Sequence, residues 1–170
     1  MKKVILKYGI IAGVITTSMM IISTTLHIQN PDSKGSEIIG FTGMFIAFIF
    51  IFLGIKNYRD KQNKGVISFG TAFKIGFLIC LIASTMYVVT WMLESHFFFP
   101  DFMEKYATHA IEQAEKSGIS ADELAKTKEE MNNYVAWYKS PFLRIALTYM
   151  EILPIGLVIT LVSSLILKKK

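Results

Sequence analysis

The sequence predicts an all-α integral membrane protein: a bundle of four transmembrane helices, with an extramembrane helical hairpin between the third and fourth spans. Three observations carry this prediction. The 170 residues are 52% hydrophobic and 18% charged, whereas soluble domains carry about 25% charged residues. Four apolar runs are long enough to cross a bilayer as helices, which takes about 20 residues each. Basic residues flank these runs, whereas most acidic residues gather between Glu94 and Glu130. The length suits one membrane domain, residues 1–170.

The first span is expected at about residues 8–28, after a basic start. A basic start followed by an apolar run also describes a secretory signal peptide. This run, however, is longer than the apolar core of about 7–15 residues in a signal peptide, and Ser23-Thr24-Thr25 is a poor cleavage site. A retained helix is therefore the preferred interpretation. Gly9 and Gly13 have the four-residue spacing of small residues that lets membrane helices approach closely.

The second span is expected at about residues 36–55 and the third at about residues 66–93, joined by a basic turn over residues 56–65. Lysine and arginine next to a span resist translocation, so this turn is predicted to lie in the cytoplasm. Small residues recur at every fourth position of the third span and form one narrow stripe: Ala72, Gly76, Cys80 and Ser84. We expect this stripe to make the closest helix–helix contact, with Gly76 as a packing residue.

Residues 95–140 are predicted to leave the membrane on the outer side as a helical hairpin. Two capping-box patterns, Asp101 with Glu104 and Ser120 with Glu123, are expected to open its two helices. The segment is acidic, whereas the segments predicted to lie inside are basic. This segregation of charge indicates membrane topology, so the net charge of +5 is not interpreted as nucleic-acid binding.

The fourth span is expected at about residues 142–167. Ser140 and Pro141 supply a capping hydroxyl and a proline at the first helical position. Residues 168–170 are all lysine and are expected to stop the span in the cytoplasm. Gly156 is a further small residue expected in helix packing. With four spans and basic segments on one side, both termini are predicted to be cytoplasmic.

Three stretches of the sequence resemble a known family. They are Tyr58-Arg-Asp-Lys with Gly65-x-Ile-Ser-Phe-Gly70 and Ala72-Phe-Lys-x-Gly76, then Pro100-Asp-Phe-x-Glu-Lys-Tyr106, and finally Glu151-Ile-Leu-Pro154-x-Gly156 with a lysine-rich end. Together they resemble a bacterial family of small four-span membrane proteins catalogued as a domain of unknown function. The resemblance covers nearly the whole chain. It implies the topology derived from charge, and with it a multi-pass protein of the bacterial inner (cytoplasmic) membrane, but no activity, ligand or catalytic residue.

Glu151 is the main residue of a candidate intramembrane polar site. A carboxylate in the hydrocarbon core costs about 3 kcal/mol unless it is protonated or paired. Pro154 follows Glu151 within one turn and removes a helical hydrogen bond, so an unpaired carbonyl is expected beside the acid. Two interpretations stay open. Glu151 either forms a proton- or cation-linked site, or is a structural glutamic acid that is neutral or bonded to Thr148, Tyr87 or Thr85.

Lys74 completes the candidate site because its charge is opposite to that of Glu151. Counted from the two membrane faces, both residues fall in the middle third of a hydrocarbon core of about 30 Å, so a long lysine could reach the acid. Lysine at this depth also extends readily to the headgroups. Extension to the cytoplasmic headgroups is the preferred interpretation, and an ion pair with Glu151 is the alternative.

Other chemistry-bearing residues match no known constellation. His27, Glu94, His96 and His109 are expected at the outer surface, and their spacing matches no metal motif. The single Cys80 cannot form an internal disulfide. The sequence contains no nucleophile elbow, phosphate loop, zinc-protease helix or dinucleotide fingerprint. We therefore expect no catalytic residue, no metal, no cofactor and no enzymatic activity.

Two functions remain open. The first is a structural or accessory membrane protein, with the lipid bilayer and a protein partner or homo-oligomer as its partners and no nucleic acid among them. The second is a subunit of an oligomeric transporter or channel that uses Glu151 and Lys74. The first is preferred because almost every polar residue has an ordinary structural explanation.

Overall fold

The computed structural model describes residues 1–32 and 35–169. Ser33, Lys34 and Lys170, which fall in the turn after the first predicted span and in the basic C-terminal end, lie outside the described residues. The described residues form six α-helices and no β-strand, so the predicted all-α class is confirmed. An isolated antiparallel bridge joins Ile67 and Lys169.

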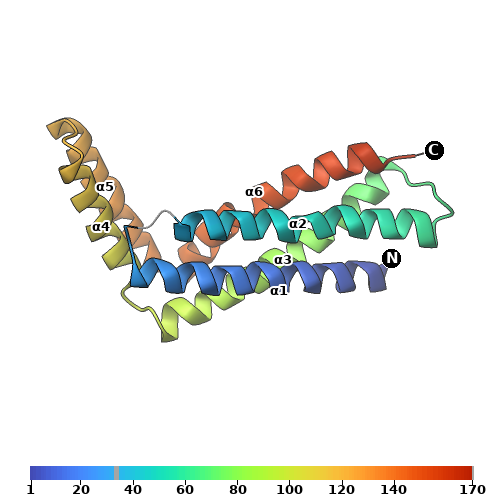
Figure 1. Cartoon of the computed structure of the whole chain (residues 1–170), viewed down its shortest axis with the longest axis horizontal. Helices are drawn as coiled ribbons and strands as arrows, with labels where there is room; N and C mark the ends of the chain where they lie inside the picture. Colours follow the sequence, from blue (N-terminus) through green and yellow to red (C-terminus); the bar gives the residue numbers. More distant parts are fainter. Residues whose placement is uncertain (33–34, 170) are drawn as a thin grey trace. The chain divides into compact units, whose positions relative to one another are not determined.

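Four of these helices are long and apolar enough to cross a membrane (Figure 1). They are α1 (Lys2–Gln29), α2 (Gly35–Gln62, with Ile38–Gln62 as the candidate span), α3 (Phe69–Phe97) and α6 (Pro141–Leu167). Between α3 and α6, the helices α4 (Phe102–Lys116) and α5 (Ala121–Tyr138) pack against each other as a hairpin. The predicted order of three spans, a helical hairpin and a fourth span is therefore confirmed.

The basic turn predicted over residues 56–65 is mostly helix, because α2 continues through Gln62. Its lysine, arginine and glutamine residues are good helix formers, so they extend the helix beyond the apolar run. The helix stops where Lys64 and Gly65 take positive φ angles of 54° and 83°, which glycine adopts without steric cost. The third helix begins at Phe69 rather than at 66, because Ile67 is extended and pairs with Lys169.

The chain divides into two compact units. The first unit comprises Met1–Val89 and Tyr149–Lys170 and so contains α1, α2, most of α3 and the C-terminal part of α6. The second unit comprises Thr90–Thr148 and contains the end of α3, the α4–α5 hairpin and the start of α6.

In the first unit, glycines set the distance between α1 and α3. A Cβ atom added at Gly9 would lie 2.9 Å from the Cβ of Ile82, and one added at Gly13 would overlap the sulfur of Met86. Because both pairs are offset by the same number of residues, α1 and α3 run parallel. The two glycines leave room for bulky side chains of the neighbouring helix, as small residues do in membrane proteins.

Glycines also leave room for bulky side chains in other helix contacts of the first unit. A Cβ at Gly43 of α2 would lie 2.5 Å from the Cβ of Met19, and α1 and α2 run antiparallel beside each other (Figure 1). A Cβ at Gly54, nearer the other end of α2, would lie 2.5 Å from Cδ1 of Ile79 and 3.2 Å from Cγ of Tyr8. Gly54 was not predicted as a packing residue, because it lacks a small residue at four-residue spacing.

The contact between α3 and α6 contains the stripe of small residues. A Cβ at Gly76 would lie 2.8 Å from Cγ2 of Thr160 and 3.0 Å from Cδ1 of Ile55. A Cβ at Gly156 of α6 would overlap the sulfur of Cys80. The stripe residues Ala72, Cys80 and Ser84 are fully buried. These pairs show that α3 and α6 run antiparallel.

The α4–α5 hairpin of the second unit buries little. Ala107 is the buried residue of α4, and α5 has none. The capping box at Ser120 and Glu123 is formed as predicted, with both of its hydrogen bonds. The one predicted at Asp101 and Glu104 is wrong. Asp101 precedes α4 with φ −95° and ψ 12°, outside the extended region that a capping side chain needs, and it makes no side-chain cap bond.

Candidate functional site

Glu151 of α6 is bonded to α3 through Tyr87. The hydroxyl of Tyr87 donates a hydrogen bond to Oε1 of Glu151, and the two oxygens are 3.1 Å apart. Tyr87 is only 7% exposed, whereas Glu151 is exposed. Glu151 as a whole residue therefore reaches the surface, while a buried tyrosine holds its carboxyl group.

A second hydrogen bond joins the same two helices close by. Oγ1 of Thr85 lies 2.9 Å from the hydroxyl oxygen of Tyr149, and it donates its own proton to the carbonyl of Leu81 at 2.8 Å. A threonine hydroxyl has one proton, so Tyr149 is the donor to Thr85. Two tyrosine hydroxyls thus link α3 and α6 at neighbouring positions, one from each helix.

The surroundings of Glu151 on α6 face outward. Met150 is 72% exposed, and Pro154 is also exposed. Pro154 has no N–H group, so the carbonyl of Met150 receives no helical hydrogen bond from it. The outward face of α6 (Met150, Glu151 and Pro154) therefore combines an acidic residue with a proline that leaves the Met150 carbonyl without its usual helical bond.

Of the three bonding partners predicted for Glu151, Tyr87 is the one that the structure supplies. Thr85 bonds Tyr149, and Thr148 donates to the carbonyl of Arg144 at 2.8 Å. Thr148 is a poor partner because its hydroxyl is satisfied within its own helix, as is common for threonine in membrane helices.

The structure does not bring Lys74 and Glu151 together. Lys74 is exposed and precedes Tyr87 on α3 by roughly 20 Å along the helix axis, at about 1.5 Å per residue. The antiparallel contact of α3 with α6 puts Glu151 beside Tyr87, so a lysine side chain at position 74 cannot reach it. The predicted site is thus a carboxyl group with a tyrosine, and not an ion pair.

Arg144, which lies in the second unit, was not predicted from the sequence as a site residue. Its guanidinium donates to the carbonyl of Tyr138 from Nε at 3.0 Å and from Nη2 at 2.5 Å. Its Nη1 donates to Oγ of Ser95 at 3.1 Å, so the start of α6 is tied to the end of α3 and to the end of α5. The available signal was that Arg144 is the one cation inside the apolar run 142–167.

Glu94 was expected at the surface but is buried, with 8% of its area exposed. Its Oε2 has no hydrogen-bond partner among the described residues. Its backbone carbonyl accepts from the N–H groups of Phe98 and Phe99, both at 2.9 Å. In the described part of the chain, no group of three or more His, Cys, Asp and Glu residues is arranged to hold a metal ion.

The four apolar helices and the hairpin define a small helical protein with several candidate membrane spans. Within that class, the chain matches the family described as "Protein of unknown function (DUF4199)" over residues 7–169. The chain therefore belongs to this family, and the resemblance seen in the sequence motifs is confirmed. Comparison with curated proteins gave no match, and comparison with solved structures gave none either.

Proposed function

We propose that this protein is an accessory component of a bacterial inner membrane that associates with another membrane protein through the outward face of α6. The observation that carries the proposal is the position of Glu151, an exposed residue of a candidate membrane helix whose one hydrogen bond to the described residues comes from Tyr87. A carboxyl group in contact with lipid tails is costly, because hydrocarbon offers it no hydrogen bond.

A transmembrane helix of a partner can supply the hydrogen bond to Glu151 that lipid tails cannot. A side-chain donor on such a helix would satisfy the second oxygen of Glu151, and its own backbone would stay bonded within the helix. Exposed Met150 beside the acid favours this arrangement, because methionine adapts its shape to irregular neighbours. The partner is therefore a membrane helix with a polar donor, packed on the outward face of α6.

The experiment is co-purification after mild detergent extraction, with Glu151→Leu compared against Met150→Leu. Both variants change an exposed residue of α6 to leucine, but only the first removes the carboxyl group. We expect Glu151→Leu to reduce the recovered partner roughly tenfold, in line with an interhelical hydrogen bond of about 1–2 kcal/mol, and Met150→Leu to leave it nearly unchanged. Equal recovery with Glu151→Leu and the native protein would contradict the proposal.

The alternative function is a subunit of an oligomeric transporter or channel that uses Glu151 and Lys74. Lys74 does not reach Glu151 within one chain, so this function requires the two residues to act in separate places or between copies. Ion flux into proteoliposomes tests it with Glu151→Gln, which keeps the shape of the side chain. If the native protein shows ion flux and Glu151→Gln abolishes it while the partner still co-purifies, the function is transport and not the accessory role.

We also propose that both ends of the described chain and the α2–α3 connection face the cytoplasm, and that the hairpin faces outward. The positive-inside rule supports this orientation. Lys61→Cys and Lys116→Cys, each in a Cys80→Ala background, form a matched pair of exposed positions. In intact cells an impermeant maleimide should label position 116 and not position 61. Labelling of position 61 in intact cells would show that the protein has the opposite orientation.

A further inference from the structure

One end of the first unit carries a dense group of basic side chains. Lys2, Lys3 and Lys7 lie on the first two turns of α1, and all three are exposed. Lys168 and Lys169 follow α6 and are exposed as well. The start of α1, the end of α6 and the α2–α3 connection lie at the same end of this unit (Figure 1). We call this end of the first unit the basic end, and its exposed lysines are Lys2, Lys3, Lys7, Lys56, Lys61, Lys64, Lys168 and Lys169.

The last turns of α2 and the α2–α3 connection add three more exposed lysines, Lys56, Lys61 and Lys64. Asp60 is the one acidic residue in these stretches of the sequence. Nε of Arg59 lies 2.6 Å from Oδ1 of Asp60, so the acid mainly compensates the arginine next to it. The basic end therefore keeps a strongly positive net charge.

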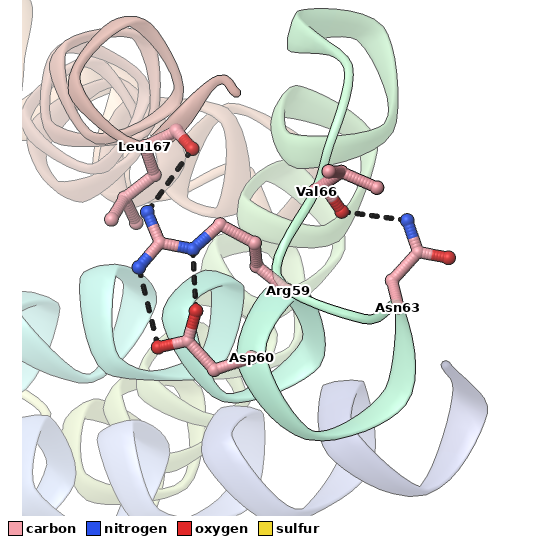
Figure 2. A network of polar contacts seen from close by, with 5 residues as sticks. All are labelled: Arg59, Asp60, Asn63, Val66 and Leu167. Carbon is pink, nitrogen blue, oxygen red and sulfur yellow. Dashed lines mark hydrogen bonds and ion pairs between the residues drawn. The ribbon is translucent and has the colours of Figure 1, made fainter. Parts of the chain in front are cut away.

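Hydrogen bonds hold segments of the basic end together, and Figure 2 shows the one from the side chain of Arg59 to the carbonyl of Leu167. Nη1 of Arg59 donates to the carbonyl of Leu167, with the two atoms 3.4 Å apart. The N–H of Lys169 donates to the carbonyl of Ile67 at 2.9 Å, and the N–H of Ile67 donates back at 2.8 Å. Lys168 and Lys169 are thereby held beside the lysines at the end of α2, because these bonds fix the backbone next to both groups.

Apolar side chains adjoin these lysines. Leu6 is exposed beside Lys7, and Leu165 and Ile166 are exposed just before Lys168. A lipid monolayer offers acyl chains next to charged headgroups, and so it complements both features at once. A nucleic acid offers phosphates without an apolar layer beside them, and it leaves these side chains in water.

We propose that the basic end binds the headgroups of anionic phospholipids. Lysines at the ends of membrane helices lie at headgroup depth, where clusters of basic residues attract anionic lipids. This site is a different surface from the outward face of α6, and the proposal does not depend on a protein partner. Its chemistry is that of several ammonium groups around lipid phosphates, and it weakens with salt because the lysines are exposed.

The test measures lipid binding to the purified protein in detergent by native mass spectrometry, with phosphatidylglycerol and phosphatidylcholine as probes. We expect phosphatidylglycerol to bind about tenfold more tightly at low salt. Changing Lys2, Lys3, Lys7, Lys168 and Lys169 to glutamine should remove this preference. Equal affinity of the native protein for the two lipids would overturn the proposal, whatever the variants do.

The α4–α5 region supplies a matched control, because it also has five lysines: Lys105, Lys116, Lys126, Lys128 and Lys139. Changing those five to glutamine alters the net charge by the same amount and should leave the preference intact. An equal loss in both variants would mean a general charge effect and would overturn the proposal. Displacement of the lipid by soluble glycerol phosphate or by a short DNA duplex would overturn it too, because a lipid site also requires the acyl chains.

Discussion

The helices of the first unit and the α4–α5 hairpin are equally regular, but different interactions stabilise them. In the first unit, side chains such as Ile75, Cys80 and Ala83 are fully buried, and glycines admit bulky neighbours between the helices. In the hairpin, α5 buries no residue, and its start is secured by the capping box of Ser120 with Glu123. Close packing between residues far apart in the sequence therefore stabilises the first unit. The hairpin is stabilised largely by interactions between residues close together in the sequence.

This difference is the one expected if lipid surrounds the apolar helices and water surrounds the hairpin. Between helices in lipid, burial of apolar surface gives no net drive for association, so close packing has to supply it. In water, short helices are marginal without caps and side-chain pairs, so local signals matter more. Substitutions should therefore cost most where they add volume in the first unit and least where they remove an exposed charge in the hairpin.

The largest effect is expected for Gly76→Leu. An added Cβ alone would meet Thr160 and Ile55 from two other helices at 3.0 Å or less. We expect a loss of folding free energy on the order of 3 kcal/mol, measured as a lower melting temperature in detergent. Gly70→Leu is the control on the same helix, because no atom lies within 4 Å of a Cβ there. If the two variants melt alike, close packing at Gly76 does not stabilise the first unit.

A smaller effect is expected in the hairpin for Ser120→Ala. Oγ of Ser120 accepts from the N–H of Glu123 at 3.3 Å, and loss of such a cap costs about 1 kcal/mol of helix stability. Hydrogen exchange should become faster in the first turns of α5. Asp101→Ala should change α4 much less, because Asp101 makes no side-chain cap bond. Equal acceleration in both helices would show that both capping patterns operate in solution.

The capping box should also make α5 sensitive to acid. Hydrogen bonds from the hydroxyl and N–H of Ser120 hold the pKa of Glu123 below its ordinary value. A pKa lowered by folding means that the carboxylate stabilises the folded helix above the ordinary pKa of about 4.3. That contribution is lost as the pH falls through the lowered folded-state pKa. Exchange rates in α5 should respond to pH below about 4, and Glu123→Gln should flatten the response.

The smallest effect is expected for the ion pair between α4 and α5. Nζ of Lys128 lies 2.8 Å from Oε1 of Glu115, and both side chains are nearly half exposed. Exposed pairs of this kind contribute about 0.5 kcal/mol or less, and salt screens them. Glu115→Gln should therefore leave the melting temperature almost unchanged, and 1 M salt should remove even that difference. A large shift would mean that the hairpin depends on charge more than on its caps.

The sequence was sufficient to predict the number of spans, the hairpin and the family. Apolar length and flanking charge determine whether a helix crosses the bilayer, and both can be counted along the chain. The capping box at Ser120 could be predicted for the same reason, because its hydrogen bonds join residues three apart. The pattern at Asp101 failed because the turn that precedes α4 sets the backbone angles of Asp101.

The candidate site was harder to predict, because it depends on how two helices are placed along each other. Counting depth from the two membrane faces put Lys74 and Glu151 in the same layer. The contacts of Gly76 with Thr160 and of Gly156 with Cys80 put them well apart. The burial of Glu94 and the contacts of Arg144 likewise depend on packing between elements, which hydrophobic periodicity does not encode.

The glycine contacts of the first unit also limit how its helices can move. Met86 occupies the space that Gly13 leaves, and Ile82 does the same at Gly9, so the two pairs fix the position of α1 along α3. A slide of α1 by one turn would keep a glycine opposite one of the two bulky side chains, but it would put the other against Thr17 or Ile5, which leave no such space. The two contacts therefore oppose sliding of α1 along α3 more than they oppose tilting or bending. A force applied along the axis of α1 would therefore tend to move α3 in the same direction.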